Sequence, residues 1–182
     1  MKLEFPAAPE IKLNPHAPAS ITEEGVFEGY ASLFDLPDLS QDVVRRGAFT
    51  DSLARRGTGN IRMLWQHDPG QPIGTWSTIR EDARGLFVRG RLNLAVARAR
   101  EVHALMRDGA IDGLSIGYRV QRAGKDRRRG QRILEKLDLW EISVVTFPML
   151  PAARVSQIKG GSDRLAAAIR RAADKLFPRP AF

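Results

Sequence analysis

The sequence of 182 residues contains no cysteine, which excludes a cysteine nucleophile, a disulfide framework and a thiolate metal site. It has no run near the ~18 consecutive apolar residues that a membrane-spanning helix needs. Residues 1–6 lack the apolar core of a secretory signal peptide. We therefore expect a protein that stays in the cytoplasm and has no membrane partner.

The sequence also lacks the motifs by which common cofactors are bound. No group of histidine and carboxylate residues has the spacing of metal ligands, and there is no phosphate-binding loop or dinucleotide fingerprint. The sequence therefore predicts neither a metal nor an organic cofactor. With 43% hydrophobic and 27% charged residues, the composition is that of an ordinary globular domain.

Acidic residues are fewer than basic ones. Lysine and arginine number 29 against 21 aspartates and glutamates, which gives a net charge of +8. A basic surface can bind nucleic acid or acidic protein segments, but these cations are spread along the chain, apart from the runs at 125–129 and 170–171. No groove-reading motif is present and aromatic residues make up only 7%, so we do not expect a nucleic-acid partner.

Proline content and hydropathy divide the chain into three parts. Residues 1–24 are proline-rich without clean periodicity, and we interpret them as an extended arm. Residues 25–155 carry the alternating patterns of a folded domain. Residues 156–182 form a basic tail, in which 163–176 has the apolar stripe of an amphipathic helix.

The central part is predicted to be rich in β-strands. Alternation and β-branched residues predict strands at 26–34, 61–67, 73–79, 86–92 and 113–121. A further strand begins at 132 and either continues or bends through 140–147. Helices are expected at 50–56 and 95–108, and a turn at 68–72. Because the strands come in runs, we predict a mostly β (α+β) fold, an antiparallel sheet or barrel of six or seven strands with helices outside.

A histidine ends one of these strands. Trp65 and His67 fall on one face of 61–67, directly before the predicted turn. An imidazole at a sheet edge or barrel mouth can accept and return a proton near neutral pH. The alternative is a structural histidine that bonds to its own turn. His103, in a predicted helix, is interpreted as structural or exposed, and His16 lies in the arm.

A serine lies between two glycines in 113–117, at Ser115. The glycines permit a close backbone approach, as a peptide substrate requires; alternatively the segment is a strand with a core-facing serine. The spacing also matches the nucleophile elbow of α/β-hydrolases. We reject that match, because 118–121 continues as a strand where the elbow needs a helix, and because every histidine precedes Ser115.

A lone acid, Glu141, interrupts the apolar segment 139–148. Burying a carboxylate is costly unless it is paired. Glu141 can bond to the far nitrogen of a catalytic histidine, orienting it and stabilising its charged form. It can equally form a salt bridge to an arginine or face water at the mouth of the sheet. Asp138 is a weaker candidate for the same role.

Taken in order, these segments resemble the prohead (procapsid) maturation proteases of tailed bacteriophages and their relatives in prophages and gene transfer agents. The resemblance covers about residues 27–155. It rests on the segments 29–35, 46–49, 64–68, 72–74, 113–118 and 141–148. Arg46 departs from the proline that is common in the family, which should alter a turn and not the chemistry.

The resemblance implies a serine endopeptidase related to the herpesvirus assemblins, with a closed, mostly antiparallel β-barrel ringed by helices. It implies that Ser115 is the nucleophile and that His67 is the general base and then the general acid. Assemblins use a second histidine as the third member. No histidine follows Ser115 here, so an acid must serve, and we choose Glu141 over Asp138.

The resemblance also implies substrates: a scaffold protein, scaffold-like segments of the major capsid protein, and the protease itself. Cleavage would take place inside the assembling procapsid, in the cytoplasm of a bacterial host, and the enzyme could act as a homo-oligomer. The tail 156–182 is either a scaffold contact trimmed by autocleavage or a helix docked on the domain. The alternative to an enzyme is a catalytically silent scaffold- or capsid-binding module of the same fold.

Overall fold

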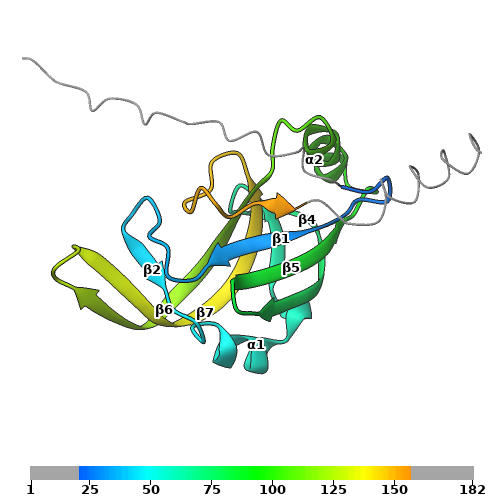
Figure 1. Cartoon of the computed structure of the whole chain (residues 1–182). Helices are drawn as coiled ribbons and strands as arrows, with labels where there is room; N and C mark the ends of the chain where they lie inside the picture. Colours follow the sequence, from blue (N-terminus) through cyan, green and yellow to red (C-terminus); the bar gives the residue numbers. More distant parts are fainter. Residues whose placement is uncertain (1–20, 157–182) are drawn as a thin grey trace, which may run out of the picture.

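A computed structural model describes residues 21–156, which form a curled β-sheet with helices at its ends (Figure 1). The strands are β1 (Val26–Leu33), β2 (Asp42–Val44), β3 (Arg62–Trp65), β4 (Asp68–Glu81), β5 (Gly85–Leu92), β6 (Gly113–Asp126), β7 (Gln131–Val145) and β8 (Val155–Ser156). The helices are α1 (Thr50–Arg56), the 3-10 helix η1 (Thr58–Asn60) and α2 (Ala97–Arg107). Residues 1–20 of the predicted arm and the helix predicted in the tail lie outside the described residues.

Strand β7 organises the sheet. It pairs along one edge with β6 in antiparallel register, and along the other edge in parallel with β2 near its start and β3 near its end. From β3 the sheet continues through β4, β5, β1 and β8 by antiparallel pairs. The sheet is thus mostly antiparallel, as predicted, with two parallel pairings that strand patterns alone do not reveal.

The sheet of residues 21–156 is open, so the predicted closed barrel is not found in the described part of the chain. Closure requires β1 and β6 to meet, but β1 ends the ladder with the two-residue β8. Beyond β8 an isolated bridge between Gly113 and Arg154 is what reaches β6. A single bridge is not a ladder, and the fold is therefore a curled half-barrel.

Burial follows the predicted alternation and helical spacing. Phe27 of β1 is fully buried and packs edge-on against Trp76 of β4, with ring centroids 5.6 Å apart. Helix α2 buries Ala99, Val102 and Met106, an i, i+3, i+7 stripe. Helix α2 packs on β4 and β5, whereas α1 packs mainly on β7. The two helices lie at opposite ends of the sheet and do not ring it (Figure 1).

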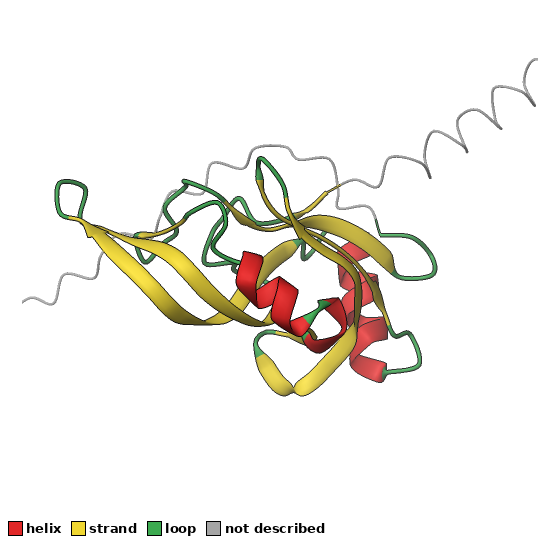
Figure 2. Ribbon diagram, turned by 90° about the horizontal axis from the view of Figure 1, so that it is seen from below, coloured by secondary structure: helices red, strands yellow, loops and turns green. Residues whose placement is uncertain are grey.

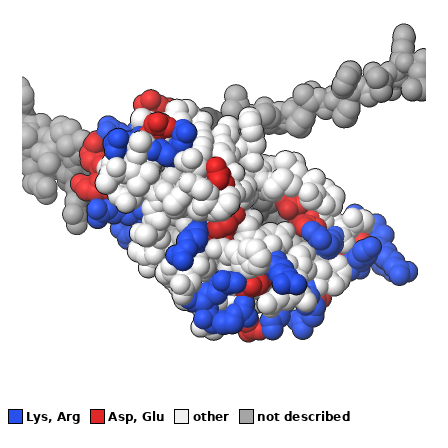
Figure 3. Space-filling model, turned by 180° about the vertical axis from the view of Figure 1, so that it is seen from behind, with Lys and Arg blue, Asp and Glu red and all other residues white. Residues whose placement is uncertain are grey.

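The β6–β7 hairpin extends away from the helices, as seen from below in Figure 2. Its basic turn lies at 127–130. On the face shown in Figure 3, lysines and arginines gather at this end and along the lower side, with acidic residues among them. Among the cations of the described residues, Lys136 is paired with Asp51 and Arg122 with Glu135. No helix in 21–156 is long and apolar enough to cross a membrane.

Candidate active site

The connection between β3 and β4 carries the histidine. Trp65 pairs with Asp68, so Gln66 and His67 are the two central residues of a hairpin turn. Their φ angles of 52° and 60° have the positive sign that a type I′ turn requires. The turn therefore lies at 66–67, and the prediction of a turn at 68–72 was wrong because β4 already begins at Asp68. Such a conformation costs about 1–3 kcal/mol for each residue with a side chain, so surrounding contacts must hold it.

Strand β7 supplies those contacts. The backbone N–H of Gln66 donates to the carbonyl oxygen of Val144 at 3.1 Å, and its side-chain amide donates to Oγ1 of Thr146 at 2.7 Å. The backbone N–H of His67 donates to Oγ of Ser143 at 3.0 Å. The turn is thus fastened to β7 at the point where the imidazole projects.

Ser115 is the third residue of β6 and lies opposite Ser143 of β7. The residue is buried, with 6% of its surface exposed. Its Oγ lies 2.9 Å from Nε2 of His67. Strand β6 continues to Asp126 without a helix, so the segment is not a nucleophile elbow.

Glu141 lies on β7, two residues before Ser143 and on the same face of the strand. Its Oε1 lies 2.6 Å from Nδ1 of His67. An ionised carboxylate only accepts hydrogen bonds, so Nδ1 carries the proton and Nε2 is left to accept the hydroxyl proton of Ser115. The hydrogen bond to Glu141 raises the pKa of His67 above its usual value, although burial of the ring opposes this.

The sheet register explains how residues 48 positions apart meet. Ser143 of β7 is paired with Ser115 of β6 on one side and with Leu64 of β3 on the other. The turn that follows β3 then carries His67 over Glu141. The structure therefore brings together the three side chains that the sequence proposed as a catalytic set.

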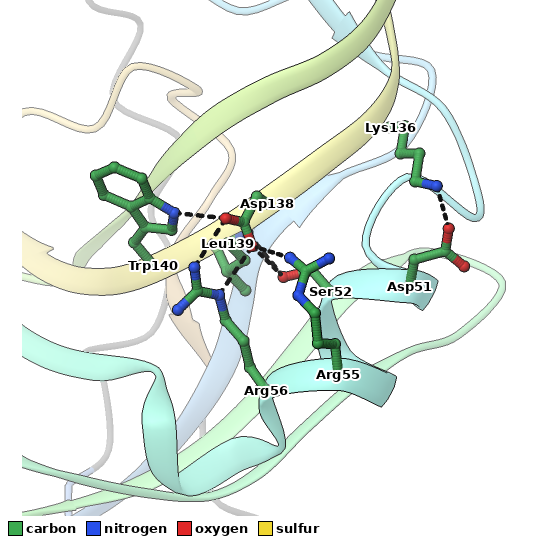
Figure 4. Close-up of polar contacts among 8 residues, drawn as sticks. All are labelled: Asp51, Ser52, Arg55, Arg56, Lys136, Asp138, Leu139 and Trp140. Atoms are coloured by element: carbon green, nitrogen blue, oxygen red, sulfur yellow. Dashed lines mark hydrogen bonds and ion pairs between the residues drawn. The ribbon is translucent and has the colours of Figure 1, made fainter.

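Asp138 lies in a separate cluster between α1 and β7 (Figure 4). Its carboxylate accepts hydrogen bonds of 2.5 to 3.3 Å from the side chains of Ser52, Arg55, Arg56 and Trp140. The hydrogen bonds from Arg56 and then Trp140 hold the pKa of Asp138 well below its usual range. Asp138 has no contact with His67 and instead ties α1 to the sheet.

His103 lies outside this site. Nε2 of His103 lies 2.8 Å from the carbonyl oxygen of Thr22, which links α2 to the segment before β1. His16 lies outside the described residues. Within 21–156, no group of three or more histidine, aspartate and glutamate residues could hold a metal ion.

A cavity of about 270 Å³ opens beside Ser115 and His67. Its apolar lining comes largely from the leucines and methionine at Leu33, Leu36, Leu114, Met149 and Leu150. Tyr118 and the ion pair of Asp42 with Arg132 also line it. Burial, with Asp42 beside it, raises the pKa of Tyr118 to about 12, so this phenol keeps its proton. A peptide side chain could enter this cavity next to the serine hydroxyl.

The two glycines around Ser115 make room for the protein's own atoms. A Cβ at Gly117 would lie 2.0 Å from Oε1 of Glu141, and one at Gly113 would lie 2.5 Å from the carbonyl oxygen of Val145. The sequence suggested that they admit a substrate backbone. In the structure, Gly117 instead leaves space for the carboxylate that contacts His67.

The sequence did not single out Ser143, although it contacts both His67 and Glu141. A signal was present, because Ser143 is a hydroxyl in an apolar strand two residues from a lone acid. That spacing places both side chains on one face of the strand.

Residues 12–166 match the model of the caudovirus prohead serine protease family. This family is one of peptidases. The chain belongs to the caudovirus prohead serine protease family, which confirms the family predicted from the sequence motifs.

Two curated relatives are prohead proteases. That of Enterobacteria phage HK97 is 35% identical over 139 residues, which are 75% of this chain and 61% of the relative. That of Escherichia phage T5 is 30% identical over 132 residues, which are 71% of this chain and 61% of the relative. The chain thus spans about three-fifths of the length of these curated relatives.

The capsid assembly protease of bacteriophage T4 has a similar fold. It aligns with a TM-score of 0.54 and 16% identity over 68% of this chain and 82% of its own. At this identity the similarity concerns the fold alone, and it agrees with the mostly β architecture described above.

Proposed function

We propose that the protein is a serine endopeptidase of viral procapsid maturation. Ser115 is the nucleophile, His67 the general base and then the general acid, and Glu141 the acid behind the imidazole. The observation that carries the proposal is the continuous line of contacts from Oγ of Ser115 through both ring nitrogens of His67 to Glu141, at 2.9 and 2.6 Å. Family membership supports the same conclusion.

The reaction is acyl transfer in two halves. Nε2 of His67 takes the proton of Ser115 while Oγ attacks the scissile carbonyl carbon, and it then gives that proton to the leaving amine as the C–N bond breaks. Water next attacks the acyl-enzyme, its proton passing to Nε2, and Ser115 recovers its proton as the ester bond breaks. Throughout, Glu141 holds the proton-bearing Nδ1 and stabilises the imidazolium.

The names of the relatives suggest the substrates. Since these are prohead and capsid assembly proteases, we propose that this protein cleaves a scaffold protein, or scaffold segments of the major capsid protein, inside the assembling procapsid in the host cytoplasm. Residues 25–155 are the proposed protease domain. The flanking parts, 1–24 and 156–182, are proposed targets of autocleavage, and self-association as a homo-oligomer belongs to the same proposal.

Co-expression of the full chain with a precursor of the major capsid protein from the same genome tests the proposal. The wild type is expected to shorten the precursor, whereas Ser115→Ala folds and leaves it intact. Ser77→Ala removes an exposed hydroxyl from β4 and serves as the control. Unchanged processing by Ser115→Ala would remove Ser115 from its role. A folded wild type that binds the precursor without cutting it would favour the catalytically silent module.

A further inference from the structure

The hydroxyl of Ser143 lies between the backbone of His67 and the carboxylate of Glu141. Its Oγ accepts the N–H of His67 at 3.0 Å and donates to Oε2 of Glu141 at 2.7 Å. Ser143 is completely buried, so bulk water does not compete for either hydrogen bond.

Packing alone does not account for a serine at this position. Its neighbours on β7, Ile142 and Val144, are apolar and fully buried. A buried hydroxyl costs free energy unless it is hydrogen-bonded, and alanine has almost the same size. Compared with a methyl group, the hydroxyl adds two hydrogen bonds, one with His67 and one with Glu141. Both residues belong to the candidate active site.

We propose that Ser143 is a positioning residue that fixes the imidazole of His67 and the carboxylate of Glu141 relative to each other, a role that rests on the proposed function. Its single proton goes to Oε2, which turns Oε1 toward Nδ1 of His67. Its lone pair accepts the N–H of His67, and this bond supports a residue whose φ of 60° is unfavourable by itself.

Loss of this hydroxyl should affect proton transfer and leave binding unchanged. Without Ser143 the carboxylate of Glu141 is free to rotate away from Nδ1, and the turn that carries His67 loses one of its anchors. Small errors in placement of reacting groups are costly to rate. Ser143 does not line the cavity beside Ser115, so affinity for a peptide-like molecule should not depend on it.

A second serine provides a matched control. Ser52 of α1 is also almost fully buried. Its Oγ accepts the N–H of Leu139 at 2.9 Å and donates to Asp138 at 3.3 Å, as Figure 4 shows. Ser52→Ala therefore removes the same kind of bridge between an N–H and a carboxylate, but outside the candidate active site.

The test compares the full-length wild type with Ser143→Ala, Ser143→Cys and Ser52→Ala. A peptidyl phosphonate, which reacts with activated serines, gives the maximal labelling rate and the half-saturating concentration. Nuclear magnetic resonance of the histidine ring gives the pKa of His67. The wild type has no cysteine, so the introduced thiol has no partner for a disulfide within the chain.

For Ser143→Ala we expect a maximal labelling rate lower by about 10- to 100-fold, with an unchanged half-saturating concentration. The pKa of His67 should fall toward its ordinary value as its hydrogen bond to Glu141 weakens. For Ser143→Cys, the labelling rate and the pKa of His67 should lie between those of the wild type and Ser143→Ala, because a thiol is a weaker donor. Ser52→Ala should match the wild type in both measurements.

The proposal would be overturned if Ser143→Ala had the labelling rate of the wild type and the same pKa of His67. It would also be overturned if Ser143→Ala and Ser52→Ala lost the same factor in labelling rate. If Ser143→Ala does not fold, Ser143→Cys carries the same comparison. A wild type that takes no phosphonate would overturn the proposed function instead. In that case the pKa of His67 in the Ser143 variants still decides whether Ser143 positions the pair.

Discussion

Glu141 and His67 share a hydrogen bond of 2.6 Å but differ in exposure, with 12% of the glutamate side chain and 42% of the histidine side chain accessible. The acid is fixed inside the sheet, while the imidazole reaches from it into the cavity beside Ser115. This arrangement suits an acid that orients a base, because the carboxylate keeps one position while the ring exchanges protons at its open side.

The variant Glu141→Gln removes the charge and keeps the size of the side chain. Because Glu141 raises the pKa of His67, that pKa should fall in the variant. Only neutral His67 can take the proton of Ser115, so the labelling rate should fall as the pH drops through the pKa of His67. In the wild type this fall should lie above the ordinary value of 6.5, and in the variant it should move to lower pH. The plateau rate should drop by about 10²–10⁴-fold. Phosphonate labelling across the neutral range measures both, and an unmoved acidic limb would contradict the role of Glu141.

The variant Gly117→Ala should displace Glu141 without unfolding the sheet. The added Cβ meets Oε1 and Cδ of Glu141 at 2.0 and 2.7 Å, and the end of a side chain can move aside. We expect a stability change within about 1 kcal/mol and a labelling rate as low as that of Glu141→Gln.

Gly124→Ala is the control on the same hairpin, because its Cβ meets a single atom within 4 Å, Oε1 of Glu135 at 3.5 Å. Thermal unfolding and phosphonate labelling of both variants make the comparison. If Gly117→Ala were labelled as fast as the wild type, the position of the Glu141 carboxylate would not depend on the absence of a side chain at residue 117.

The variant Asp138→Asn should reduce stability and leave the chemistry intact. It removes the charge that binds Arg55 and Arg56, at a cost of about 2 kcal/mol. The pKa of Asp138 is depressed in the folded state, so its contribution is present above its ordinary value of 3.8 and is lost as the pH falls through the folded-state pKa. Urea unfolding at neutral and acidic pH should show the two proteins converging in acid. Loss of labelling in a folded Asp138→Asn would give Asp138 a place in the chemistry.

The periodicity of apolar residues predicts many of the strands and helices of this fold, but it does not predict which strands pair with one another. Strand β1, helix α1 and strand β5 agree with the predicted ranges to within one residue, because their inward faces repeat every second residue or every turn. The openness of the sheet depends on β8, and a two-residue strand has no period. Likewise, the parallel pairing of β3 with β7 depends on which edges meet in space.

The turn was misplaced for a local reason. Pro69, Gly70 and Pro72 are common turn residues, yet they stand at the start of β4, where register shifts interrupt the ladder with β3. The left-handed conformations fall on Gln66 and His67, and neither is one of the glycine, asparagine and aspartate residues that dominate such turns. Contacts with β7 impose that turn, and those contacts are invisible to a local pattern.

The sequence supplied the residue types of the site but not its supports. His67 stood out because it ends a predicted strand. Ser115 stood out because it lies between two glycines, and Glu141 because it is the lone acid in an apolar segment. Glu141 was preferred to Asp138 as the lone acid of the apolar segment and again through the resemblance, and in the structure the two acids have different partners. Ser143 was missed because its importance arises only when β3 and β6 pair on either side of it.

Mass spectrometry of the wild-type chain after reaction with a peptidyl phosphonate tests the central claim most directly. The account predicts one covalent adduct, on Ser115, that is lost in His67→Ala although the fold is kept. An unlabelled wild type, or an adduct on Ser115 formed equally fast without the imidazole of His67, would contradict it.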